Sequence, residues 1–156
     1  MQKPPPFGTR GDRTPKYTVK EVAGIMELSP YTVRYYENAG LVPGVDRSDG
    51  NIRLFSDYSL NWLRLVHCLR ATGLPIDGVR RYIELCAKGD ASIPERAEII
   101  FAQEKSLRRQ LKTLNRQMEV LKYKKHVYEE LLAGRDTDRC NPATMPKAEP
   151  DIVPRA

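Results

Sequence analysis

Three cysteines and two histidines are the residues of this chain whose types could support covalent or metal chemistry. Cys68, Cys86 and Cys140 are too few and too scattered for a disulfide framework, and no C-x-x-C pair typical of a zinc ribbon is present. His67 and His126 have no evident nucleophile or carboxylate arranged around them, and the chain lacks a phosphate-binding glycine loop. We therefore expect a protein that is not an enzyme and that carries no cofactor and no metal.

Cys68 has a sequence context that favours thiol reactivity. It is expected at the edge of the apolar face of a helix, and the guanidinium of Arg64, one turn earlier, could stabilise its thiolate. Free cysteine is commonly buried, so a small, partly buried hydrophobic residue is the alternative interpretation. His67 adjoins Cys68 in sequence, but neighbours on a helix point about 100° apart. Cys68 is therefore the candidate effector-sensing residue.

The charge of the chain favours a polyanionic partner. The 156 residues include 26 Lys and Arg against 20 Asp and Glu, which gives a net charge of +6 and a pI of about 9.3. A hydrophobic share of 40% suffices for one compact domain with appendages. The apolar runs are too short to span a membrane, and the first residues lack the apolar stretch of a secretory signal. We expect a cytoplasmic protein that is not associated with a membrane.

Two short helices with a tight connection are expected near the start of the ordered chain. Thr18-Val19-Lys20-Glu21 has the T-x-x-E pattern of a capping box, which begins a helix. Ser29-Pro30 begins a second helix, with an N-cap serine followed by proline at the first helical position. This helix should run to about Asn38 and stop at Gly40. Such a pair, with polar and aromatic groups on the second helix, indicates a helix-turn-helix.

A small β-hairpin wing is expected over residues 42–55. Asp49-Gly50 is a hairpin turn signal, and the residues after it alternate between polar and apolar types at the period of a strand. Ser56 should cap a third helix that runs to about Thr72, and Pro75 should open a fourth. Together these elements predict a winged helix-turn-helix.

A helix over residues 92–133 is the longest expected element, and Ser92-x-x-Glu95 suggests a capping box at its start. Apolar residues recur there at two heptad positions, interrupted by Glu104 and Lys125. Such a helix spans roughly 60 Å, which is more than the small winged helix-turn-helix could cover. We therefore expect a homodimeric coiled coil, either parallel or antiparallel. The heptad residues are Ala97, Ile100, Leu107, Leu111, Leu114, Met118, Leu121, Tyr128 and Leu132.

The expected fold is mainly α. A winged helix-turn-helix DNA-binding domain with a small β-hairpin wing occupies residues 16–90, and the long dimerisation helix occupies residues 92–133. Both ends, residues 1–15 and 134–156, are expected to be flexible because they are rich in proline and poor in apolar residues. The N-terminal arm is also basic.

The second helix and the wing carry the residue types that read DNA. Phosphate contacts position a protein on a duplex, and base-edge contacts specify the sequence. Arg34 could bind phosphate or pair with guanine, with a solvated surface charge as its alternative. Core packing is the alternative for each tyrosine, above all for Tyr36, and an ordinary charged turn is the alternative for the wing arginines. The candidate DNA-binding residues are Lys20, Thr32, Arg34, Tyr35, Tyr36, Arg47 and Arg53.

Several spaced motifs occur together in residues 17–86. They are Tyr17-Thr18-Val19-x-Glu21-Val22-Ala23, Ser29-Pro30-x-Thr32-Val33-Arg34-Tyr35-Tyr36-Glu37-x-x-Gly40-Leu41-Val42-Pro43, Gly50-x-x-Arg53-x-Phe55 and Leu69-Arg70-x-x-Gly73-Leu74-Pro75. In these motifs the chain resembles the DNA-binding domain of the MerR family of transcriptional regulators. It departs from many members at Ile52 and Phe55, where they carry tyrosine.

The resemblance implies a mechanism. A homodimer would bind a near-palindromic operator inside an overlong promoter spacer, and the activated dimer would bend and untwist the DNA so that RNA polymerase engages both promoter elements. The segment around Trp62, Cys68 and Gly73 is similar to the thiol-based branch that responds to aldehydes and other electrophiles, which implies alkylation or S-nitrosylation of Cys68. A metal-responsive member remains an alternative, although Cys140 has no second cysteine nearby. An effector-free architectural or excisionase-like protein is another, and the long helix argues against it.

Overall fold

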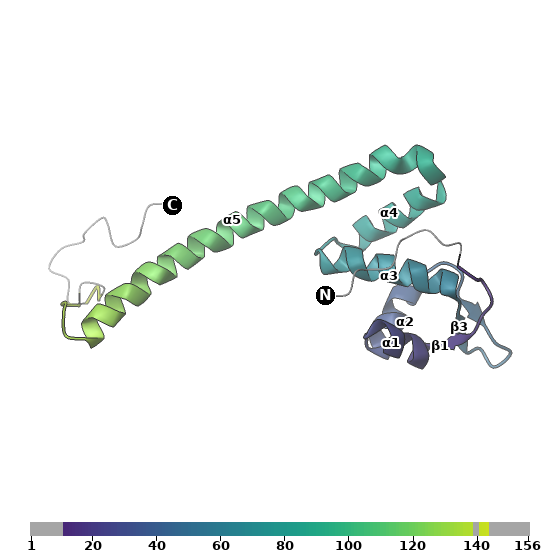
Figure 1. The fold of residues 1–156 in the computed structure, drawn as a ribbon, viewed down its shortest axis with the longest axis horizontal. Helices are drawn as coiled ribbons and strands as arrows, with labels where there is room; N and C mark the ends of the chain where they lie inside the picture. Colours follow the sequence, from purple (N-terminus) through teal and green to yellow (C-terminus); the bar gives the residue numbers. More distant parts are fainter. Residues whose placement is uncertain (1–10, 139–140, 144–156) are drawn as a thin grey trace. The chain divides into compact units, whose positions relative to one another are not determined.

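The computed structural model describes residues 11–138 and 141–143 (Figure 1). Its elements form two units, residues 1–103 and 104–156, which are described separately below. The expected class, mainly helical with a small sheet and a long C-terminal helix, is confirmed. The elements in chain order are β1 (Tyr17–Thr18), α1 (Val19–Met26), α2 (Pro30–Asn38), β2 (Asp46–Arg47), β3 (Arg53–Phe55), α3 (Asp57–Ala71), α4 (Ile76–Ala87), the 3-10 turn η1 (Gly89–Ser92) and α5 (Ile93–Leu132).

Local capping chemistry sets the start of α1 and α2, as the sequence predicts. The Glu21 carboxylate accepts a hydrogen bond from the Thr18 backbone N–H at 2.8 Å, and the Thr18 hydroxyl accepts one from the Glu21 N–H. Ser29 Oγ accepts from the Thr32 N–H at 3.0 Å, with proline at the first position of α2. Gly40, just beyond the end of α2, has φ +71°, the left-handed conformation that ends helices.

The wing consists of β2, β3 and the turn between them. A strand that the sequence analysis did not predict, β1, pairs with the other side of β3, so the sheet order is β1-β3-β2. The predicted turn at Asp49-Gly50 is confirmed: these two residues lie at its centre, and the Asn51 N–H donates to the Ser48 carbonyl at 2.8 Å. Ser48 and Ile52 close it through a backbone hydrogen bond of 2.9 Å, and Asn51 takes the left-handed conformation at φ 58°. Asparagine tolerates that conformation, so it replaces glycine there.

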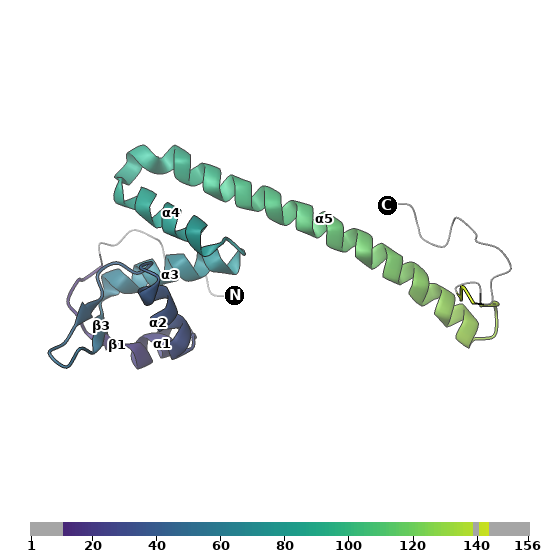
Figure 2. The same ribbon diagram turned by 180° about the vertical axis from the view of Figure 1, so that it is seen from behind.

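The core of the first unit lies where α1, α2, α3 and α4 meet. In Figures 1 and 2, α3 lies between the α1–α2 pair and α4. Phe55 of the wing and Leu63 of α3 are fully buried in this core together with Val22 and Val33. The sheet and the helices therefore share a single apolar cluster, which holds the wing and α2 on the same small domain.

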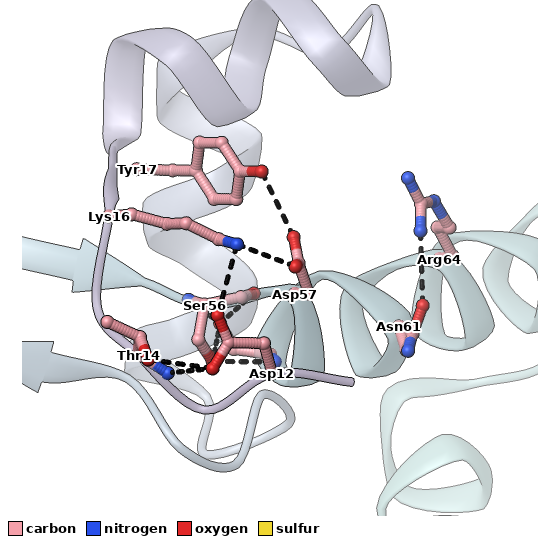
Figure 3. A network of polar contacts seen from close by, with 9 residues as sticks. Asp12, Thr14, Lys16, Tyr17, Ser56, Asp57, Asn61 and Arg64 are labelled. Atoms are coloured by element: carbon pink, nitrogen blue, oxygen red, sulfur yellow. Dashed lines mark hydrogen bonds and ion pairs between the residues drawn. The ribbon is translucent and has the colours of Figure 1, made fainter. Parts of the chain in front are cut away.

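The segment before β1 packs against the start of α3 (Figure 3). The backbone carbonyl of Asp12 accepts a hydrogen bond from the Tyr58 backbone N–H. Lys16 forms an ion pair of 2.7 Å with Asp57, which also accepts from the Tyr17 hydroxyl. Residues 11–15 thus make specific contacts, unlike the flexible arm expected for residues 1–15. Residues 1–10 lie outside the described part of the chain.

Charges in this N-terminal segment stabilise one another. A hydrogen bond from the Thr14 backbone N–H is the main reason why the pKa of Asp12 is lowered from 3.8 to about 2. The ammonium of Lys16 lowers the pKa of Asp57, and Asp57 in turn raises the pKa of Lys16.

The start of α5 differs from the sequence prediction. Ser92 does not cap the helix: its buried hydroxyl lies 2.6 Å from the Leu85 carbonyl and 2.7 Å from the Gly89 carbonyl, and it accepts from Arg96. The reason is that η1 runs directly into α5. The first amide of α5 is already bonded to Asp90, so the serine faces back toward α4.

Apolar side chains along α5 are exposed in the single chain. The heptad residues Leu107, Leu111, Leu114, Met118 and Leu121 have exposed fractions between 40% and 61%, and no residue of α5 is buried. None of the described helices has both the length and the apolar composition needed to cross a lipid bilayer.

Candidate DNA-binding surface

One face of α2 is anchored in the core, and the other is exposed. Val33 is fully buried and Tyr36 is 7% exposed, so these two side chains hold the helix on the domain. Tyr36 therefore lies in the core, in agreement with the alternative interpretation for this candidate. On the opposite face, Arg34 is exposed and Tyr35 is 44% exposed. Rigid attachment of a helix that presents an arginine and a tyrosine suits insertion into a major groove.

The first turn of α2 is tied to its own cap. Thr32 is half-buried, and its hydroxyl lies 2.8 Å from Ser29 Oγ. Tyr31, beside it, is 76% exposed and offers a hydroxyl and a ring face, although it was not among the candidates. Its place one residue after the N-terminal proline of α2 is the signal that could have found it. Lys20 is exposed in the first turn of α1.

The two wing arginines are held by the end of α2. Arg53 Nε lies 2.5 Å from a Glu37 carboxylate oxygen, and its Nη2 donates to the Asn38 side chain at 2.6 Å. Arg47 is 3.6 Å from the other Glu37 oxygen and donates to Asn51 at 3.1 Å. Arg53, a predicted DNA contact, is thus committed to contacts inside the domain, whereas Arg47 keeps part of its guanidinium in solvent.

A contact from α4 reaches the end of α2. Arg80 Nη2 donates to the carbonyl of Ala39 at 3.2 Å, and Arg81 forms an ion pair of 3.0 Å with Glu95 at the start of α5. Adjacent arginines on α4 therefore contact α2 on one side and α5 on the other. Sequence reasoning missed Arg80 and Arg81, because the partner of each lies in another element and no local motif marks either residue.

Cys68 is exposed on α3. Arg64, expected to face this thiol, donates instead to the Asn61 side chain at 3.1 Å (Figure 3). Cys86 is half-buried, and Arg96 Nη1 lies 3.7 Å from its sulfur. Cys140 lies outside the described residues. Within the described part of the chain, no three His, Cys, Asp or Glu side chains gather in a way that could hold a metal ion.

The sequence of this chain is similar to those of known transcriptional regulators. Residues 17–86 match a family model described as MerR HTH family regulatory protein. An uncharacterized HTH-type transcriptional regulator of Haemophilus influenzae is 33% identical over 131 residues, which cover 84% of this chain and 97% of that relative. The chain belongs to the MerR family. It is therefore a DNA-binding transcriptional regulator and not an enzyme.

Other family members match over smaller parts or at lower identity. The regulator AdhR of Bacillus subtilis is 34% identical over 82 residues, which span 53% of this chain and 59% of AdhR. The crystal structure of HiNmlR, described as a MerR family regulator lacking the sensor domain and bound to promoter DNA, has a TM-score of 0.62 at 35% identity. That match covers 75% of this chain and 89% of HiNmlR. A putative MerR family regulator from Listeria monocytogenes has a TM-score of 0.64 at 27% identity, over 76% and 90% of the two chains.

Proposed function

We propose that this MerR-type regulator binds a near-palindromic promoter operator as a homodimer, with α2 and the wing of each protomer on one half-site. The exposed face of α2, with Arg34 and Tyr35 held rigidly by buried Val33 and Tyr36, is the observation that carries the proposal. Lys20, Thr32 and Arg47 supply further donors around it. The promoter DNA bound to the related HiNmlR supports the same class of ligand here.

Dimerisation along α5 follows from its exposed apolar stripe. The heptad side chains of α5 other than half-buried Ala97 are exposed in the single chain, and contiguous exposed apolar surface of this kind marks an interaction site. A second copy of the same helix offers the same stripe, so a symmetric pair buries both. Two joined α2 helices then address two half-sites, and the energy of their contacts can deform the DNA between them, to which RNA polymerase responds.

The proposed signal is modification of Cys68. Its exposed thiol can reach a soluble electrophile without opening the fold. Addition of the thiolate to a conjugated aldehyde forms a carbon–sulfur bond, and the adduct takes one proton from water, so no oxidant is needed. Among the described residues, no cluster of metal-ligating side chains supports the metal-responsive alternative.

Replacement of Arg34 by alanine tests the DNA-binding part. We expect Arg34→Ala to weaken binding to a duplex selected from random sequence by the wild-type protein by about 1–3 kcal/mol, as the loss of a base contact does. Fluorescence anisotropy measures the affinity. Lys88→Ala, which removes an equal charge from the exposed end of α4, is the matched control. Equal effects of the two substitutions would show that Arg34 acts only through net charge.

Replacement of Cys68 by serine tests the sensing part. We expect Cys68→Ser to retain DNA affinity and to lose the transcriptional response to a conjugated aldehyde in a promoter-reporter assay. Cys86→Ser, which removes the half-buried thiol beside Arg96, should respond like the wild type. A full aldehyde response of Cys68→Ser would remove Cys68 from the mechanism while leaving the DNA-binding proposal intact.

A further inference from the structure

Two arginines face each other directly across the wing. The pairing of β2 with β3 places Arg47 opposite Arg53. Like charges at directly opposed positions of an antiparallel pair are destabilising. The carboxylate of Glu37 lies within ion-pair distance of both guanidinium groups, at 3.6 Å from Arg47 and 2.5 Å from Arg53. One acidic side chain of α2 therefore neutralises the arginine pair of the wing.

The two arginines hold Glu37 with different strength. Arg53 is largely covered, with a side chain 21% exposed, and its planar fork spans Glu37 and Asn38 in two short contacts. The side chain of Arg47 is 43% exposed and divides its donors between Glu37 and Asn51. Arg53 is thus a fixed connection to α2, whereas the guanidinium of Arg47 is partly exposed to solvent.

We propose that Glu37 is a positioning residue that latches the wing to α2 and so sets the spacing of the two elements that contact DNA. Glu37 follows Arg34 by one helical turn and is next to the buried Tyr36, so the latch joins a rigid part of α2 to β3. Arg53 then acts through Glu37 without touching DNA. The outer edge of Arg47 is available to a phosphate. This inference rests on DNA binding through α2 and the wing.

Electrostatics gives a sharp test of the latch. A carboxylate near a polyanion repels it, so neutralising Glu37 should tighten DNA binding if the residue has no positioning role. If Glu37 holds the wing in place, the same substitution weakens binding to the operator, because the wing no longer meets its phosphates. The two roles therefore predict changes of opposite sign.

The experiment compares Glu37→Gln with Asp49→Asn. Both remove one negative charge from this region, but Asp49 is an exposed residue of the wing turn, where asparagine is equally suitable. Anisotropy titrations use a duplex selected from random sequence by the wild type and a scrambled duplex of equal length.

We expect Glu37→Gln to bind the selected duplex about tenfold more weakly, a loss typical of a charge-assisted contact. Its binding to the scrambled duplex, and that of Asp49→Asn to both, should be unchanged or tighter. Unchanged or tighter binding of Glu37→Gln to the selected duplex would overturn the latch.

A charge-conserving variant covers the case in which Glu37→Gln fails to fold, which thermal unfolding would reveal. Arg53→Lys keeps the positive charge but cannot span Glu37 and Asn38 with one ammonium group. We expect about tenfold weaker binding to the selected duplex with an unchanged salt dependence, since no phosphate contact is lost. Wild-type affinity of Arg53→Lys would contradict the latch. Failure of the wild type to select any duplex would instead contradict the DNA-binding proposal on which the latch rests.

Discussion

Residue type alone does not reveal which candidate side chains are exposed and which are bound inside the domain. Arg34 and Arg53 are both arginines in family motifs, but Arg34 is exposed whereas Arg53 is bound to Glu37 and Asn38. The partner of Arg53 lies 16 residues away in another element. Sequence reasoning could not find the contact with Glu37, because only the packed wing brings that partner near.

Asp12 provides a test of the segment that precedes β1. Because the pKa of Asp12 in the folded chain is lowered from 3.8 to about 2, its charge stabilises the fold above about pH 4. That contribution is lost as the pH falls toward about 2. We expect the urea midpoint of the wild type to fall more steeply between these pH values than that of Asp12→Asn. Asp49→Asn should follow the wild type, and parallel curves for wild type and Asp12→Asn would contradict the contacts of this segment.

At the scale of elements, the sequence predicts those starts and stops that local chemistry determines. Thr18 with Glu21 and Ser29 with Pro30 begin helices through bonds within four residues, and both starts are confirmed. The strand β1 escaped prediction because two residues show no periodicity, and it exists only through its pairing with β3. Ser92 was predicted to be a cap because serine can accept an amide, but in the fold its hydroxyl bonds toward the end of α4.

Ser92 gives a test of the α4–α5 connection. Its buried hydroxyl joins the carbonyls of Leu85 and Gly89 to the guanidinium of Arg96. We expect Ser92→Ala to lower the free energy of unfolding by about 1–3 kcal/mol, because these buried groups lose a partner. Urea denaturation followed by circular dichroism measures the loss. Ser106→Ala, at a half-buried site on α5, is the control, and an equally small effect at both sites would contradict the role of Ser92.

At the scale of the whole molecule, the proposed dimer depends on the exposed stripe of α5. Heptad periodicity predicted which side chains form the stripe, and those of the central turns are exposed in the single chain. The pattern could not choose between parallel and antiparallel pairing, since either buries the same residues. We expect Leu114→Glu to convert a dimer into monomers in light scattering at micromolar concentration. Thr113→Glu, one position off the stripe, should remain dimeric.

The mass of the protein bound to DNA tests the central claim most directly. Sedimentation velocity with the selected duplex gives the number of chains per duplex, and a scrambled duplex reports sequence specificity. Two chains on each selected duplex, with Leu114→Glu unable to form that complex at the same concentration, is the result that the account predicts. A complex with one wild-type chain per duplex, or equal affinity for selected and scrambled DNA, would contradict a dimeric, sequence-specific regulator.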